Sequence, residues 1–159
     1  FGIIDLLSRA ALAKHRVLSR LGPEPLSSDF DAFALARACR GKKTSLKAAL
    51  LDQRVVAGLG NIYVSEALHR AGLSPHRRAS TIATAAGLPR DHARRLAVAI
   101  KHVLKEAIDR TLKRTSYRSS RFRVYDREGE PCRRTNCIGA IRRQTQGGRS
   151  TFYCPICQR

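Results

Sequence analysis

Residues 51–68 read LDQRVVAGLGNIYVSEAL, and this stretch decides the fold. Its GLG segment is too rich in glycine to continue a helix. A helix that Thr44 caps is expected before the glycines. After them, Asn61 is expected to cap a second helix over 62–70, which Gly72 ends. Two helices joined by a tight glycine turn form an arrangement that docks on DNA.

The end of the chain carries four of the five cysteines, spaced Cys132-x4-Cys137-x16-Cys154-x2-Cys157. Two close pairs with a hairpin-length spacer suit tetrahedral Zn²⁺, and four thiolates leave no position open for a catalytic water. The sequence therefore predicts one structural zinc ion per chain. Two disulfides or an iron–sulfur site are the alternatives. The fifth cysteine, Cys39, has no partner nearby and is interpreted as a buried core thiol.

The spacer between the cysteine pairs has the pattern of a β-hairpin. Residues 141–145 and 149–153 are expected to be its strands, with 146–148 as the turn. So small a module cannot build a sufficient apolar core, and the metal must supply much of its folding free energy. Arg149 follows the turn directly, where a guanidinium can reach a phosphate.

The rest of the chain is expected to be mainly helical. Asp29 is a candidate cap for a helix that carries Phe30, and 91–113 shows the clearest amphipathic periodicity. Residues 121–125 alternate like a strand. The fold class is thus mainly α, with a small β-hairpin zinc finger at the end.

We divide the chain at two points where the pattern of residue types changes. An interdomain segment is expected over 1–25, a helical DNA-binding domain over 26–116 and a zinc-ribbon finger over 117–159. The chain begins at Phe1 and contains no Met, so we expect it to be part of a longer protein.

The net charge of +19 indicates a polyanionic partner. Double-stranded DNA is the expected one. No apolar run approaches the ~20 residues that a bilayer span needs, so no membrane association is expected. We expect a monomer in the bacterial cytoplasm, at the nucleoid.

Three stretches together resemble the formamidopyrimidine-DNA glycosylase family. Residues 51–68 resemble its helix-two-turn-helix signature, 147–158 its C-terminal zinc-finger signature and 122–132 the lead-in to that finger. The resemblance covers about residues 20–159. It implies a bifunctional enzyme that excises oxidised purines (formamidopyrimidine, 8-oxoguanine) and then cleaves the strand at the abasic site.

In that family the nucleophile is an N-terminal proline amine in a β-sandwich catalytic domain. The resemblance therefore implies that this domain is absent here and that the chain alone is inactive. The residues it assigns to DNA binding are Lys43, Lys47, Gly60, Asn61, Tyr63 and Arg149, and Arg149 also assists elimination. Phe1 resembles the end of a loop that wedges into the base stack.

Two departures leave alternatives open. The family often has two residues between the first cysteine pair, where this chain has four. The segment 109–118 is shorter and more basic than the family's lesion-capping loop, which puts the preferred lesion in doubt. Three other interpretations are open: a relative that acts on oxidised pyrimidines, a non-enzymatic binder of damaged or abasic DNA, and a generic zinc-ribbon protein. The 58–67 motif argues against the last of these.

Overall fold

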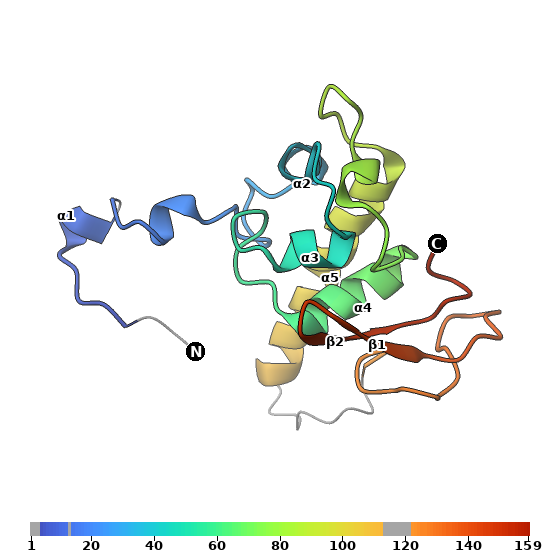
Figure 1. The fold of residues 1–159 in the computed structure, drawn as a ribbon. Coiled ribbons are helices and arrows are strands. Elements are labelled where there is room, and N and C mark those ends of the chain that lie inside the picture. Colours follow the sequence, from blue (N-terminus) through green and yellow to red (C-terminus); the bar gives the residue numbers. More distant parts are fainter. Residues whose placement is uncertain (1–3, 13, 113–121) are drawn as a thin grey trace.

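The computed structural model describes residues 4–12, 14–112 and 122–159. The helices of residues 32–112 form a helical body, and the finger of residues 122–159, with its β-hairpin, lies beside it (Figure 1). The N-terminal arm, residues 4–12 and 14–20, extends away from both. In chain order the elements are α1 Arg9–Leu12, η1 Leu18–Arg20, α2 Ala32–Cys39, α3 Leu46–Leu51, α4 Asn61–Ala71, η2 Ala79–Ile82, α5 Asp91–Leu112, β1 Arg142–Gln146 and β2 Arg149–Tyr153. The mainly helical class with a terminal hairpin is confirmed.

The core of the helical body is built around the packing of α4 on α5. Helix α5 buries Leu96, Ile100 and Val103, which recur at helical spacing on one face. Leu68 of α4 and Leu35 of α2 are fully buried in the same cluster. Because burial of each such side chain contributes about 1.5–3 kcal/mol, this core can hold the body together.

Cys39 is part of this core, as expected. Burial raises the pKa of its thiol to about 11, although the nearby charge of Lys42 acts in the opposite direction. The thiol is therefore neutral at pH 7 and packs as a small apolar side chain.

The helices begin one or two residues from the expected caps. Asp31, not Asp29, caps α2, and its Oδ1 accepts from the Ala34 amide at 2.7 Å. Ser45, not Thr44, caps α3 in the same way. Gly60 is the cap residue of α4, which makes Asn61 its first helical residue. Those three cap assignments were wrong because several adjacent residues had cap-forming side chains or a cap-compatible backbone. Gly72 does end α4, with φ +70°.

The turn between α3 and α4 is organised by Gln53. Its side-chain oxygen accepts from the Gly58 amide at 2.7 Å, and its Nε2 donates to the Leu59 carbonyl. Gly58 has φ +75°, a conformation that side chains resist. Val56 and Leu59 are buried, so the turn is anchored in the core as well. The start of α4 is therefore held in a fixed place.

The hairpin pairs β1 and β2 antiparallel, with Gln146 opposite Arg149. Gly147 and Gly148 form its two-residue turn with φ +57° and +72°, the positive pair that the twist of a hairpin favours. A small apolar cluster, which includes Val124, Ile141 and Phe152, lies beneath it. The sequence had placed Gln146 in the turn, but it is the last residue of β1.

The expected strand at 121–125 is not present at residues 122–125. Instead, the carboxylate of Glu66 in α4 accepts from three consecutive amides, those of Arg123, Val124 and Tyr125, at 2.8–2.9 Å. Amides bound to one carboxylate cannot pair in a strand ladder, which explains the difference. Arg121, Phe1 and the proposed domain limit at 116/117 lie outside the described residues.

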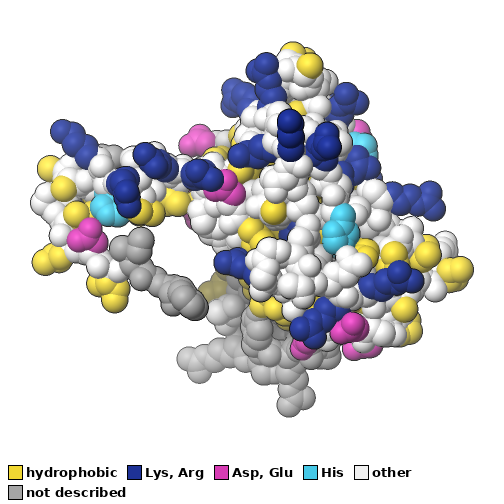
Figure 2. Space-filling model, viewed as in Figure 1, with side chains coloured by type: hydrophobic (Ala, Val, Ile, Leu, Met, Phe, Trp, Pro, Cys, Tyr) yellow, Lys and Arg dark blue, Asp and Glu magenta, His cyan; other side chains and the backbone are white. Residues whose placement is uncertain are grey.

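No helix within the described ranges is long and apolar enough to cross a membrane. Figure 2 shows Lys and Arg side chains over the upper part of the helical body and along the N-terminal arm, with few acidic side chains among them. The high net charge is thus spread over this face of the molecule.

Candidate metal centre and nucleic-acid interface

The four predicted cysteines converge at one point, and their Sγ atoms all lie within 4.8 Å of one another. Sγ of Cys132 lies 3.7 Å from that of Cys157, and Sγ of Cys137 lies 3.6 Å from that of Cys154. Zinc–sulfur bonds of about 2.3 Å in a tetrahedron require sulfur atoms about 3.8 Å apart. These spacings match a metal centre. They are far longer than the S–S bond of about 2.05 Å, so the structure does not pair these cysteines as two disulfides.

The backbone around Cys154 leaves little room and favours its thiolate form. A Cβ on Gly139 would lie 2.7 Å from Sγ of Cys154, so this glycine allows the chain to pass the ligands. Burial acts to raise the pKa of Cys154, but the amides of Cys157 and Ile156 and the thiols of Cys137 and Cys157 together outweigh it, so the pKa lies below its ordinary value. Burial raises the pKa of Cys132 and of Cys157 above the ordinary value. Amides aimed at sulfur favour the charged form that binds metal. The convergence of the four sulfur atoms and the room that Gly139 leaves beside them therefore fit a metal ion held by four cysteines.

Lys47 and Asn61, both assigned to DNA binding by the resemblance, meet at the hairpin. Nζ of Lys47 donates to the Ser150 carbonyl at 2.9 Å and to Oγ1 of Thr151 at 2.6 Å. Nδ2 of Asn61 donates to the same carbonyl at 3.0 Å. Ser150 follows Arg149, so three of the expected site residues come together where α3, α4 and β2 meet. Lys47 is buried at this junction, which sequence spacing did not indicate.

Burial and the neighbouring charge of Arg149 lower the pKa of Lys47 to about 8. A lysine titrating there remains mostly protonated at pH 7 and is stabilised by any anion that approaches. Beside it, a hollow of about 400 Å³ is lined by Lys47, Arg54, Gln146, Gly147 and Arg149, with Asp52 bound by Arg54. The hollow carries three cations against one paired carboxylate.

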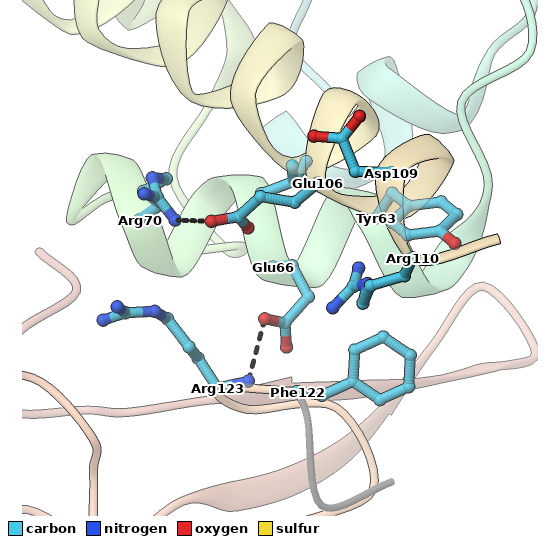
Figure 3. Close-up of a pocket in the computed structure, with 9 residues that line it drawn as sticks. Tyr63, Glu66, Arg70, Glu106, Asp109, Arg110, Phe122 and Arg123 are labelled. Carbon is cyan, nitrogen blue, oxygen red and sulfur yellow. Dashed lines mark hydrogen bonds and ion pairs between the residues drawn. The ribbon is translucent and has the colours of Figure 1, made fainter. Parts of the chain in front are cut away.

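The other expected DNA-binding residues are placed differently. Gly60 and Lys43 are exposed, Gly60 at the start of α4 and Lys43 just before α3. Tyr63 is partly buried and packs against the helical core. It also lines a second hollow of about 500 Å³ between α4, α5 and the lead-in to the finger (Figure 3). The structure brings Lys47, Asn61 and Arg149 together, with Gly60 next to them, and places Tyr63 on the other side of α4's first turn.

Glu66 was missed by the sequence reasoning, although it joins the two modules. In Figure 3 its carboxylate points from α4 toward the backbone of Arg123. It is only 7% exposed, and a glutamate on the apolar side of a helix was the available signal. The C-terminal end of α4 is bound to the finger too. The Arg134 guanidinium donates to the His69 and Arg70 carbonyls, and Gln158 donates to the Leu73 carbonyl.

His69 lies between the two modules and was also missed. The residue is only 1% exposed, and Nε2 of its ring lies 3.3 Å from Sγ of Cys132. Burial, aided by the charges of Arg134, Arg123 and Arg127, lowers the pKa of His69 to about 4, so the ring is neutral at pH 7.

These features define a class of protein, a helix-two-turn-helix domain locked to a four-cysteine hairpin finger. Residues 21–119 match the family model of the Formamidopyrimidine-DNA glycosylase H2TH domain. The chain belongs to the formamidopyrimidine-DNA glycosylase family, as the sequence resemblance indicated.

Three similar proteins illustrate the relationship. A formamidopyrimidine-DNA glycosylase of Bradyrhizobium sp. (strain ORS 278) is 57% identical over 169 residues, an alignment that covers 100% of this chain and 58% of that protein. The crystal structure of MutM (Fpg) from Thermus thermophilus is 41% identical with a TM-score of 0.78, covering 94% of this chain and 58% of that one. Lactococcus lactis Fpg in complex with DNA containing an abasic site is 30% identical with a TM-score of 0.81, covering 96% and 57%. The chain thus spans less than two thirds of each of these proteins.

Proposed function

We propose that this chain binds damaged or abasic duplex DNA at the junction of α3, α4 and the hairpin. The observation that carries the proposal is Gly60. Its φ is −102° and a Cβ added there would meet nothing within 4 Å, so nothing in the described chain requires glycine. Without a side chain, the first amides of α4 stay open to an anion. They have no carbonyl of their own helix to bind, and no side chain in the described part of the protein caps them.

The residues around this point would hold DNA phosphates. The α4 amides and Asn61 bind one phosphate, and Lys47, Arg149 and the exposed Lys43 add charge beside it. We retain Tyr63 as a further DNA contact on the family resemblance alone, since its ring packs against the helical core. Each phosphate contact releases counterions, so affinity should fall steeply with salt. Membership of the family supports DNA as the anion, because the Lactococcus lactis relative was solved with abasic-site DNA.

For the whole protein we propose excision of oxidised purines followed by strand cleavage at the abasic site, the activity that the relatives' name describes in part. The proline amine that attacks the sugar lies, in this proposal, outside these 159 residues, so the chain alone is inactive. Arg149 assists the elimination by holding the phosphate. We retain the segments 1–25, 26–116 and 117–159, a monomeric state and a bacterial cytoplasmic location as proposals.

The metal that we propose for the four cysteines is one Zn²⁺ ion. When bound, it neutralises part of the charge of the four thiolates and closes the finger. It leaves no coordination position for a substrate. The chain's own contribution is to hold the hairpin, and Arg149 with it, against α3 and α4.

Gly60→Ala tests the proposed phosphate contact at the start of α4 by adding one methyl group. We expect the thermal unfolding midpoint to change little and the affinity for a fluorescent duplex with a tetrahydrofuran abasic analogue to fall about tenfold, since a hydrogen bond to a charged group is worth about 1.5–3 kcal/mol. Arg149→Ala should weaken binding similarly, whereas Arg142→Ala removes an exposed charge of the same hairpin and should matter less. Unchanged affinity in both Gly60→Ala and Arg149→Ala would exclude this surface.

The enzymatic part of the proposal has its own test. Borohydride should trap a covalent adduct with 8-oxoguanine or abasic duplex DNA when the whole protein is used. The 159-residue chain should bind the abasic duplex without being trapped. Trapping by the chain alone would place the nucleophile within it.

A further inference from the structure

The ring of His69, in α4, contacts the cysteine cluster at Cys132. This histidine is almost completely surrounded by protein, and its Nε2 is 3.3 Å from Sγ of Cys132. Its other nitrogen, Nδ1, is buried without a hydrogen-bond partner in the described part of the chain. A buried polar ring with one unsatisfied nitrogen costs folding free energy, so an apolar side chain would serve better if His69 were only filling space.

The contact to Cys132 has a fixed direction once a metal is bound. A metal-bound cysteine is a thiolate, and a thiolate sulfur only accepts hydrogen bonds. The ring must then present an N–H on Nε2 to make this bond, while Nδ1, on its other side, is buried without a partner in the described part of the chain. With a metal in the cluster, the N–H of this ring thus has a charged acceptor, and hydrogen bonds to charged groups are the stronger ones.

Hydrogen bonds from the cysteine module to the end of α4 also hold the backbone of His69 in place. Arg134 lies in the loop between Cys132 and Cys137, and its guanidinium donates to the carbonyl of His69 itself and to that of Arg70. The loop has four residues between the cysteines, and this length brings Arg134 to the end of α4. Backbone and side chain of His69 are therefore both tied to the cysteine module.

We infer that His69 is a positioning residue of the metal centre, whose Nε2–H donates a hydrogen bond to the metal-bound thiolate of Cys132. The inference rests on the proposed metal site and goes beyond it. The bond spreads the negative charge of the thiolate, which makes Cys132 a poorer nucleophile and slows loss of the metal. It also links the metal to α4, the same helix whose first turn forms the proposed phosphate site.

Metal release measures this bond directly. His69→Phe keeps a ring of similar size without the N–H, and His69→Gln places an amide N–H near the position of Nε2. Zinc released by methyl methanethiosulfonate, followed with 4-(2-pyridylazo)resorcinol, should appear about tenfold faster from His69→Phe, in line with the ~10–100-fold cost of losing such partners. His69→Gln should restore most of the difference. His102→Phe removes a histidine from the exposed side of α5 and should behave like the wild type.

A spectroscopic signature separates a bond to sulfur from simple packing. In Co²⁺-loaded chain, loss of the hydrogen bond should move the thiolate-to-metal charge-transfer band of His69→Phe to longer wavelength. In wild type, long-range ¹H–¹⁵N spectra should show the proton of His69 on Nε2. This last measurement needs no variant to fold.

The outcomes are distinct. Equal release rates and band positions in wild type and His69→Phe would overturn the inference while leaving the metal site intact. A proton on Nδ1, or a cobalt spectrum with a nitrogen ligand, would overturn it as well, the second by making His69 a ligand. Absence of zinc from purified wild type, by elemental analysis, would overturn the metal site and the inference together.

Discussion

The helical body and the finger are stabilised in opposite ways. The body buries a continuous apolar cluster to which α2, α3, α4 and α5 all contribute. The finger's cluster is small, and two of its fully or mostly buried members, Cys132 and Cys154, are among the proposed metal ligands. In the first module the sequence pattern of apolar residues specifies the fold. In the second, the spacing of four sulfur atoms does so.

The contacts between the modules follow a third rule, since many of those described are hydrogen bonds between buried or partly buried groups. Glu66 binds three finger amides at the middle of α4, Lys47 and Asn61 bind Ser150 near its start, and Arg134 binds its end. Such bonds gain little over water but cost much to leave unmade. They therefore fix how the finger sits on α4 more than they add stability, and a fixed orientation is what a shared phosphate surface requires.

Metal removal should produce the largest effect. Structural zinc contributes on the order of 10 kcal/mol to isolated fingers, so a chelator or Cys154→Ser should unfold the region 122–159. The helical circular dichroism at about 222 nm should be largely kept, because the apolar core of the body does not depend on the metal. Amide spectra with and without chelator check both statements. Loss of the helical signal along with the finger would show that the modules fold as one unit.

The converse change is Leu68→Ala in the body. Leu68 is fully buried, and deletion of such a side chain costs about 2–5 kcal/mol. Chemical denaturation should show this loss in the helical transition, whereas the metal content should stay the same. Leu88→Ala, at a leucine that is 56% exposed, provides the control and should cost much less. A release of metal from Leu68→Ala would contradict the separation of the two modules.

Gly139→Ala sharpens the comparison within the finger. The new methyl would lie 2.7–3.0 Å from Sγ of Cys154 and the side chain of Ile156. Overpacking of this kind costs about 1–3 kcal/mol, and here it acts on a ligand. We expect weaker metal binding in a competition titration, with the helical transition unchanged. Metal affinity equal to wild type would mean that the cysteine loops can shift to make room.

Much of this architecture could be predicted because its signals are local. The glycine turn, the hairpin with its two glycines and the four-cysteine spacing each lie within a short stretch, and each is confirmed. The roles of Glu66 and His69 could not be predicted, because their partners lie about sixty residues away in the finger. The burial of Lys47 was equally hidden, since a lysine is normally solvated. The cap positions failed by one or two residues because neighbouring side chains compete for the same amides.

The smallest expected effect concerns Lys47 and the pH. Its folded pKa of about 8 is below the ordinary 10.5, so the unfolded chain binds more protons between these values and stability should rise with pH across that window.

DNA binding should change with pH in the opposite direction, because a nearby phosphate favours the protonated amine of Lys47. Affinity for the abasic duplex should therefore decline by a fewfold as the pH rises from about 8 to about 9.5, with proton uptake on binding detectable by calorimetry in buffers of different ionisation enthalpy. Lys47→Arg, which stays charged throughout, should show neither the decline nor the uptake. If wild type and Lys47→Arg follow the same pH profile, Lys47 serves only to hold the hairpin at Ser150 and does not contact the phosphate.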